Sequence, residues 1–558
     1  MLAGLLRRPL GEADKKPKPK PGKPLPPATG TRLDGIRGRP YLVDRRDTCK
    51  RLMDMADRTG YVIVRAPHQT GKTSLLQLCE RHLAERGVAT VFFDASADTD
   101  ADAARAKGML AQALSHELES VVILIDNADE LYDKYDYLKF WRLLKALGRG
   151  GSTVRVVLAV AHGTRLTGAS ASGVRDAAVR CDVPEAVVTL FRAPRGGRPS
   201  LQLTREEWLE LWQRFLVHTE LQLGDVVRDH VYATAAAQPG LIMHCLDYLE
   251  TEMTSEQVQL GSASASAMNV LCSAAFHDTL NHLRSILGHH NYLGYEHFKK
   301  VPHAYPVLRQ LLWGDSMDAT FEVDDDDWEK RYAVRETAEA LLGTLRYSSP
   351  LHRLWGMRRV YPQPKPTSVR RALRDLILSA VAQLDPYVLQ RTAGARAAGN
   401  AALRRAWETE LTRCFLARVA PETVPSVCTR EDDDGAAYTD IFLAEPYNAL
   451  VEVTRDAYAA AAAAATAAEG DNSKAPPLVP KSKRYAGLYT CGPVRTHILL
   501  DFCSPASVTS AETAIDDERL YSVRLASGYR RAFMCRMGEV IGDVTVEGSA
   551  GAESRAVL

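Results

Sequence analysis

Residues 61 to 74 read Tyr-Val-Ile-Val-Arg-Ala-Pro-His-Gln-Thr-Gly-Lys-Thr-Ser. The apolar run that opens this stretch predicts a buried strand, and the leucines that follow it are spaced as on one face of a helix. Between them lies the P-loop pattern G-x-x-x-x-G-K-[ST], with Ala66 in place of the first glycine and Gly71, Lys72 and Thr73 completing it. The stretch therefore predicts a strand, a phosphate-binding loop and a helix, in that order.

Each part of the predicted loop has a chemical role. Backbone N–H groups of the loop and of the helix N-terminus surround a phosphate. Lys72 reaches the β- and γ-phosphates, and the Thr73 hydroxyl is a ligand of Mg²⁺. Ala66 requires a first turn that tolerates a β-carbon. We expect ATP or GTP with Mg²⁺, bound by Ala66, Pro67, His68, Gln69, Thr70, Gly71, Lys72, Thr73 and Ser74.

A second apolar run, residues 121–126, ends in Asp126. A buried strand that ends in a carboxylate is typical of the Walker B motif, whose Asp holds Mg²⁺. Taken alone, the first stretch could be an ordinary glycine loop and the second a core strand ending at a turn. Their order and spacing together favour a nucleotide site. Further strands at 90–94 and 154–161 predict a doubly wound parallel sheet, the second ending at His162-Gly163-Thr164, where a γ-phosphate sensor would lie.

The source of a catalytic carboxylate is open. Many such ATPases carry Glu directly after the Walker B Asp, and here that position is Asn127. Asp129 and Glu130 follow, and either could orient the attacking water. The alternative is a solvated helix start, where acidic residues are favoured. Nucleotide hydrolysis is therefore a separate expectation from nucleotide binding.

Composition excludes several classes of protein. The chain has 558 residues, which predicts three or four domains, and its formal net charge is +1. Its ten cysteines form no C-x-x-C pattern, which argues against a zinc site or a disulfide scaffold and for reduced buried thiols. The lack of an 18-residue apolar run predicts no transmembrane helix, and we expect an intracellular protein with no membrane partner.

The chain divides by composition into five predicted parts. Residues 1–30 alternate Lys and Pro and predict a disordered basic tail, either a nuclear-import signal or a solubilising leader. Residues 31–199 hold the P-loop sheet, and 200–345 predict a helical domain, with Thr204 as an N-cap. Residues 346–405 form a basic linker or helical segment, and 406–558 form an α/β domain.

The basic segment has a stripe of arginines. Arg370, Arg371 and Arg374 are expected to share a helix turn, with Trp355 and Tyr361 nearby. Such a stripe can neutralise the phosphates of DNA. The alternative is that it pairs with the acidic run at 322–329.

Carboxylates on two predicted strands mark the C-terminal domain. Asp440 lies on the strand at 438–443 and Glu452 on the strand at 449–454, and a hairpin would bring them together. Two such carboxylates can hold a Mg²⁺ that activates water against a phosphodiester, and a helix acid such as Glu410 often completes the site. The nuclease signature is D…E-x-K. Thr454 stands at the lysine position, so Lys481 or Lys483 would supply the cation. The alternative is a pair of acids on a strand edge with no metal.

The order of these motifs resembles the Crinkler effectors of oomycetes and fungi. The resemblance covers about residues 40 to 510 and rests on these segments: the P-loop with Asp126 and Asp129-Glu130-Leu131, Gln238-Pro239-Gly240-Leu241 with Leu246-Asp247-Tyr248-Leu249, Ser349-Pro350-Leu351-His352-Arg353, the helix Trp407 to Glu410, Asp440, Glu452, Arg484-Tyr485, and Ile498-Leu499-Leu500-Asp501-Phe502. Asn127 and Thr454 depart from the family pattern.

The resemblance implies a P-loop NTPase module that regulates a restriction-endonuclease-like C-terminal domain. It also implies secretion, action in a host-cell nucleus, host protein partners and cleavage of DNA. The predicted catalytic residues are Asp129, Glu130, Glu410, Asp440, Glu452 and Lys483, and the predicted metal ligands are Thr73, Asp126, Asp440 and Glu452. The alternative is an NTP-dependent module that binds nucleic acid or protein with a catalytically inactive nuclease fold.

Overall fold

The structure is a computed structural model that describes the chain in separate stretches. These are residues 36, 40–66, 70–95, 108, 121–131, 138–147, 154–160, 184–189, 199–253, 263–280, 317–318, 339–341, 344–346, 349–360, 372–391, 401–419, 426–431, 437–443, 447, 449–455, 496–503, 520–526, 529–536 and 539–546. The tail, residues 162–164, the acidic run at 322–329, and the lysines at 481 and 483 lie outside them.

The chain forms two compact units, Met1–Leu201 and Gln202–Leu558. The finer division into five parts stays a prediction.

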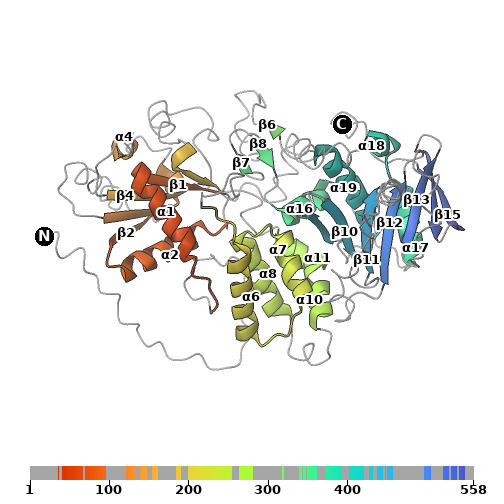
Figure 1. Ribbon diagram of the computed structural model, residues 1–558, viewed down its shortest axis with the longest axis horizontal. Helices are drawn as coiled ribbons and strands as arrows, with labels where there is room; N and C mark the ends of the chain where they lie inside the picture. The colour runs from red at the N-terminus through yellow and green to blue at the C-terminus, as the bar shows by residue number, and fades with distance from the viewer. Residues whose placement is uncertain are drawn as a thin grey trace, which may run out of the picture. The chain divides into compact units, whose positions relative to one another are not determined.

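Unit 1 is built on a five-stranded parallel sheet (Figure 1). Its strands are β1 (Tyr61–Arg65), β2 (Ala89–Asp94), β3 (Val121–Asp126), β4 (Val154–Val160) and β5 (Val187–Thr189), in the order β2-β3-β4-β1-β5. The four strands predicted from apolar runs are confirmed. The strand β5 was not predicted, because three residues are too few to show a pattern.

Helices cover both faces of this sheet. One face packs Val62, Leu124 and Val157 against α1 (Arg46–Thr59) and α2 (Lys72–Glu85). The other face packs Ile63, Ile123 and Leu158 against the side of α4 (Leu138–Leu147). Strands buried on both faces read as continuous apolar runs, which is why the sequence shows them so clearly. The prediction of a doubly wound α/β sheet is confirmed for unit 1.

The first part of unit 2 is helical. It contains α6 (Arg205–Thr219), α7 (Asp225–Thr234), α8 (Pro239–Glu252), α10 (Ala263–Leu271) and α11 (Ala274–Thr279). Thr204 caps α6 as predicted: its hydroxyl accepts from the Glu207 N–H, and the Glu207 carboxylate accepts from the Thr204 N–H. The region predicted as helical also holds a small sheet of β6 (Met317–Asp318), β7 (Glu339–Leu341) and β8 (Thr344–Arg346). Strands of two or three residues are too short for periodicity to reveal.

The rest of unit 2 is a mixed seven-stranded sheet with helices packed on it. The helices are α16 (Pro350–Val360), α17 (Leu373–Val381), α18 (Pro386–Arg391) and α19 (Ala401–Leu416). The strands are β9 (Ser426–Glu431), β10 (Ala437–Leu443), β11 (Ala449–Arg455), β12 (Thr496–Cys503), β13 (Leu520–Ala526), β14 (Arg531–Arg536) and β15 (Glu539–Thr545). Strands that follow one another in the chain are neighbours across the sheet, from β9 at one edge to β15 at the other. The strand β12 runs parallel to β11 and β13, and the other neighbouring pairs are antiparallel.

Five cysteines whose side chains the structure describes are thiols that belong to no disulfide. Cys49, Cys79, Cys245, Cys272 and Cys414 are all buried. Among the described residues, no helix is both long and apolar enough to cross a membrane.

Candidate functional site

The start of α2 provides the phosphate-facing end predicted for the P-loop. Gly71 precedes the helix with φ 91°, a left-handed conformation that glycine adopts without strain. The Leu75 N–H donates to the Gly71 carbonyl at 2.9 Å and begins the helical bonding. The N–H groups of a first helical turn have no partner within the helix and attract anions. Residues 67–69 of the loop lie outside the described stretches.

Ala66 is accommodated at the position of the first glycine. Its φ is not positive, so a β-carbon causes no backbone strain. Its N–H donates to the Val160 carbonyl at 3.2 Å, which continues the bonding between β1 and β4. The loop therefore leaves the sheet in a conformation that alanine can adopt.

Lys72, Thr73 and Asp126 are gathered at the carboxyl end of the sheet. Lys72 is 8% exposed, and its Nζ donates to the Ala66 carbonyl at 2.7 Å. Asp126 is 3% exposed and accepts a hydrogen bond from the Thr73 hydroxyl. Burial raises the pKa of Asp126, and the bond from Thr73 and the charge of Lys72 oppose that rise.

One atom of Asp126 points to an additional ligand. Its Oδ1 is buried and has no hydrogen-bond partner among the described residues. A buried acceptor without a donor is costly, and a hydrated Mg²⁺ would satisfy it. A hydroxyl and a carboxylate are the oxygen ligands that Mg²⁺ prefers, so Thr73 and Asp126 fit that metal. Lys72 and the start of α2 fit the phosphates of a nucleotide.

Asp94 joins this group at the end of β2. It is the register partner of Asp126 across the β2–β3 pair. Asn127 has φ 50°, and its Nδ2 donates to Asp94 Oδ1 at 2.9 Å. Asp94 is not among the residues predicted from the sequence, although the predicted strand at 90–94 ends in this acid at the same edge of the sheet. The predicted acids at 129 and 130 lie in the turn Ala128–Leu131, and their side chains are not described.

The two predicted carboxylate positions of unit 2 face each other in register. Asp440 of β10 pairs with Glu452 of β11 in the antiparallel ladder. Residues directly opposite each other in a ladder share one face of the sheet, so the two acidic positions lie on the same face of the β10–β11 pair. Asp501 of β12 pairs with Thr454, two residues along the same face. This face of the sheet therefore carries three acidic positions on neighbouring strands.

Glu410 has a different environment. It is fully buried in α19, and both of its oxygens accept from Arg413, with Arg413 Nη2 at 2.6 Å from Oε1 and Nε at 2.9 Å from Oε2. Its Oε1 also accepts from the Asp385 N–H at 2.7 Å, just before α18. These contacts fit an ion pair that holds α18 and α19 together. A catalytic role for Glu410 stays a prediction.

One arginine of the predicted basic stripe, Arg374, lies within the residues that the structure describes. It lies exposed in the first turn of α17 and pairs with Asp375, with Nη2 3.2 Å from Oδ1. The helix begins at Leu373, and Arg370 and Arg371 lie outside the described residues. Trp355 is buried in α16, where it cannot stack on a nucleobase from solvent.

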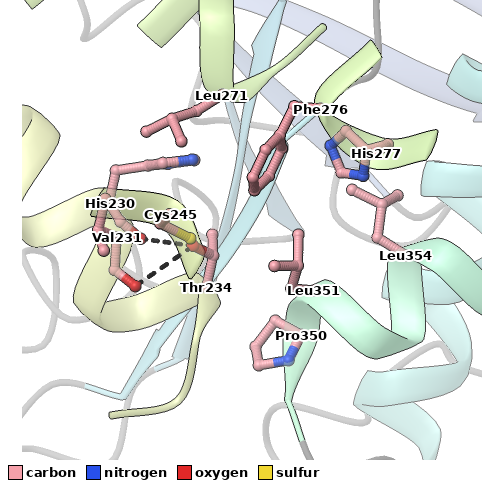
Figure 2. Close-up of a pocket in the computed structure, with 10 residues that line it drawn as sticks. All are labelled: His230, Val231, Thr234, Cys245, Leu271, Phe276, His277, Pro350, Leu351 and Leu354. Carbon is pink, nitrogen blue, oxygen red and sulfur yellow. Dashed lines mark hydrogen bonds between the residues drawn. The ribbon is translucent and has the colours of Figure 1, made fainter. Parts of the chain in front are cut away.

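A small cavity in unit 2 is lined by none of the predicted site residues. Figure 2 shows His230, Cys245 and His277 on its wall, with Phe276 and Leu354 beside them. The cavity holds about 10 Å³, roughly the room of one water molecule. It is too small for a nucleotide or another substrate.

Comparison with known proteins gives a likeness in fold. The Walker-type ATPase PABY2304 of Pyrococcus abyssi is 11% identical, with a TM-score of 0.34, 57% of this chain covered and 99% of that one. The RuvB Holliday junction branch migration motor of Thermotoga maritima is 13% identical, with a TM-score of 0.29 and 55% and 93% covered. The replication initiator DnaA bound to AMPPCP and single-stranded DNA is 15% identical, with a TM-score of 0.27 and 50% and 82% covered. No protein-family model and no curated protein matches the chain.

At these TM-scores the likeness carries no argument, and the class of unit 1 rests on its own geometry. A parallel sheet in the order β2-β3-β4-β1-β5, with a glycine-led helix after β1 and a buried Asp at the end of β3, is typical of P-loop NTPases. Unit 1 is a P-loop ATPase-like module. The resemblance to Crinkler effectors stays a prediction.

Proposed function

We propose that unit 1 binds a Mg²⁺–nucleoside triphosphate, ATP or GTP, and hydrolyses it. The observation that carries this proposal is the group of Lys72, Thr73 and Asp126 at the carboxyl end of the sheet, with Asp126 Oδ1 buried and without a partner among the described residues. Asp126 and Thr73 would hold the metal, and Lys72 and the N-terminus of α2 would hold the phosphates. The metal supplies electrostatic neutralisation of the phosphate oxygens when it is bound.

Calorimetry with Mg²⁺–ATP and Mg²⁺–GTP on the full chain tests nucleotide binding. We expect Lys72→Ala to weaken binding by about 2 to 4 kcal/mol, because the variant removes a charge that pairs with the β- and γ-phosphates. Lys50→Ala is the matched control, since Lys50 is an exposed lysine on α1 of the same unit. Equal affinity for the wild type and Lys72→Ala would refute the proposed site.

A second function is favoured by the register of unit 2. The pairing of Asp440 with Glu452 supports a Mg²⁺-dependent DNA nuclease in which these two acids bind the metal and Lys483 supplies the cation that Thr454 lacks. Glu410 is the helix acid of that proposal. The alternative for the same sheet is a module that binds nucleic acid or a host protein without cutting. Its support is Thr454, which carries no charge toward a scissile phosphate.

The widest proposal is that of a Crinkler-like effector. In it, unit 1 uses the nucleotide to regulate the C-terminal domain, and the protein is secreted and acts in the nucleus of a host cell. This proposal is supported by the order of sequence motifs alone. Its test is the location of a tagged chain in infected host cells, where a signal confined to the producing organism would refute it.

A further inference from the structure

Hydrolysis needs a group that accepts a proton from water, and the residue after Asp126 cannot provide it. The amide of Asn127 is neutral and has no basic lone pair to serve as a proton acceptor. Asp126 itself is buried and bonded to Thr73, in the position of a metal ligand. If unit 1 hydrolyses a nucleotide, a carboxylate from another element at this edge of the sheet must therefore accept the proton.

Asp94 is placed at that edge by the pairing of β2 with β3. It is the last residue of β2 and the register partner of Asp126, on a parallel strand about 4.8 Å away. The Ala95 N–H donates to the Asp126 carbonyl at 2.9 Å, which ties the ends of the two strands together. The Asp94 side chain is exposed, so water and a nucleotide phosphate can approach it.

Asn127 fixes the carboxylate of Asp94. Its backbone has φ 50°, a left-handed conformation that Asn and Asp tolerate better than other residues with side chains. In that conformation its Nδ2 donates to Asp94 Oδ1 at 2.9 Å. At this edge of the sheet the amide of Asn127 thus directly follows β3, where many ATPases carry an acid, and the acid Asp94 ends the neighbouring strand β2.

We propose that Asp94 is the catalytic base of nucleoside triphosphate hydrolysis and that Asn127 is its positioning residue. The inference rests on the proposed nucleotide binding at Lys72, Thr73 and Asp126. The oxygen of a water forms a bond to the γ-phosphorus while the bond from that phosphorus to the β–γ bridging oxygen breaks. The electron pair of the broken bond stays on the bridging oxygen of the nucleoside diphosphate, which is the leaving group. The Asp94 carboxylate accepts the proton of the water and releases it to the inorganic phosphate or to solvent.

The test compares turnover with affinity in the full chain. We expect Asp94→Asn to lower kcat for ATP or GTP by about 100-fold or more, the usual contribution of a general base. The Kd for the same nucleotide should change less than about threefold, because a base acts in the transition state and contributes little to binding of the ground state. The exchanged double variant, Asp94→Asn with Asn127→Asp, should recover part of kcat, since it returns one carboxylate to the pair.

Control variants separate this role from others. Asp54→Asn changes an exposed acid on α1 and should leave kcat unaltered. Glu130→Gln and Asp129→Asn test the two acids predicted from the sequence. Asp94 has no catalytic role if Asp94→Asn turns over within about threefold of the wild type while Glu130→Gln or Asp129→Asn does not.

Two further outcomes overturn the inference. If Asp94→Asn loses kcat and affinity together, and the double variant recovers neither, Asp94 only holds the ends of β2 and β3. If the wild type binds nucleotide tightly and never turns it over, Asp94 is no base, and nucleotide binding still stands. A wild type that binds no nucleotide refutes the proposed function itself, and the calorimetry with Lys72→Ala detects that separately.

Discussion

At the scale of single residues, the buried charge of Asp126 lowers the free energy of unfolding of the protein without nucleotide. Burial raises its pKa above the ordinary value of 3.8, so the ionised carboxylate is less favourable in the folded chain than in the unfolded one. The pH dependence of stability follows from the raised pKa. The cost is absent below pH 3.8, and it is present once the pH rises above the pKa of the folded state. At neutral pH the folded protein therefore bears it, and bound Mg²⁺ would relieve it.

We expect Asp126→Asn to raise the melting temperature of the nucleotide-free protein, because the amide fills the same space without a charge. The same variant should lose the rise in melting temperature that Mg²⁺–ATP gives the wild type, since that rise depends on ligand binding to the folded state. Thermal unfolding of both proteins, with and without Mg²⁺–ATP, measures the two effects. Asp54→Asn is the control at an exposed acid. A lower melting temperature for nucleotide-free Asp126→Asn would contradict this account.

The site residues that sequence predicts each belong to a local pattern: the loop residues to the P-loop, and Asp126 to the end of an apolar strand. Gly71, Lys72 and Thr73 follow one another at a helix start, so a local pattern contains their geometry. The contact between Asn127 and Asp94 spans 33 residues and exists because β2 pairs with β3. Tertiary packing determines which strands pair, and an apolar run in the sequence does not show its partner. The ion pair of Arg413 with Glu410 was missed for a different reason: a helix pair three residues apart looks the same in sequence whether it is exposed or buried.

At the scale of an element, α16 begins at a buried polar pair. The Ser349 hydroxyl precedes the helix and accepts from the His352 N–H at 3.1 Å, and the same oxygen lies 2.7 Å from His352 Nδ1. His352 is 1% exposed, and burial lowers its pKa to about 3. The ring is therefore neutral in the folded chain and becomes protonated below about pH 6.5 in the unfolded chain. Stability from this group is complete above pH 6.5 and is lost as the pH falls toward 3.

We expect the free energy of opening α16 to fall by about 1.4 kcal/mol for each pH unit below 6, through His352 alone. In His352→Asn, whose amide can still bond to Ser349, that part of the pH dependence should disappear. Hydrogen exchange of the α16 amides at several pH values, corrected for intrinsic exchange, gives the measurement. Leu351→Ala is the control, because it weakens the same helix without removing a titratable group. A His352→Asn helix as sensitive to acid as the wild type would show that the proton binds elsewhere.

At the scale of the whole molecule, the long strands and helices follow from the sequence and the order of strands does not. The periodicity around residues 438–454 predicts two strands, and the ladder sets Asp440 opposite Glu452, as a hairpin requires. The five further strands of that sheet carry weaker patterns, and only the ladder shows that Asp501 lies on the same face. Side chains directly opposite each other in an antiparallel pair have β-carbons about 4.5–5.5 Å apart. That spacing allows two carboxylates to share one metal ion.

The last prediction joins the two units through function. With Mg²⁺ and supercoiled plasmid, we expect the wild type to nick DNA, and Asp440→Ala to abolish nicking because one of the two metal-binding acids is gone. Asp375→Ala is the matched control, an exposed acid of α17 in the same unit. If the nucleotide regulates cleavage, adding ATP should change the nicking rate of the wild type and leave that of Lys72→Ala unchanged. Equal nicking by the wild type and Asp440→Ala would place the activity elsewhere. If the wild type does not nick plasmid with any divalent metal, while plasmid still binds in a gel-shift assay, the C-terminal sheet is a binding surface and the non-cutting alternative is the function of unit 2.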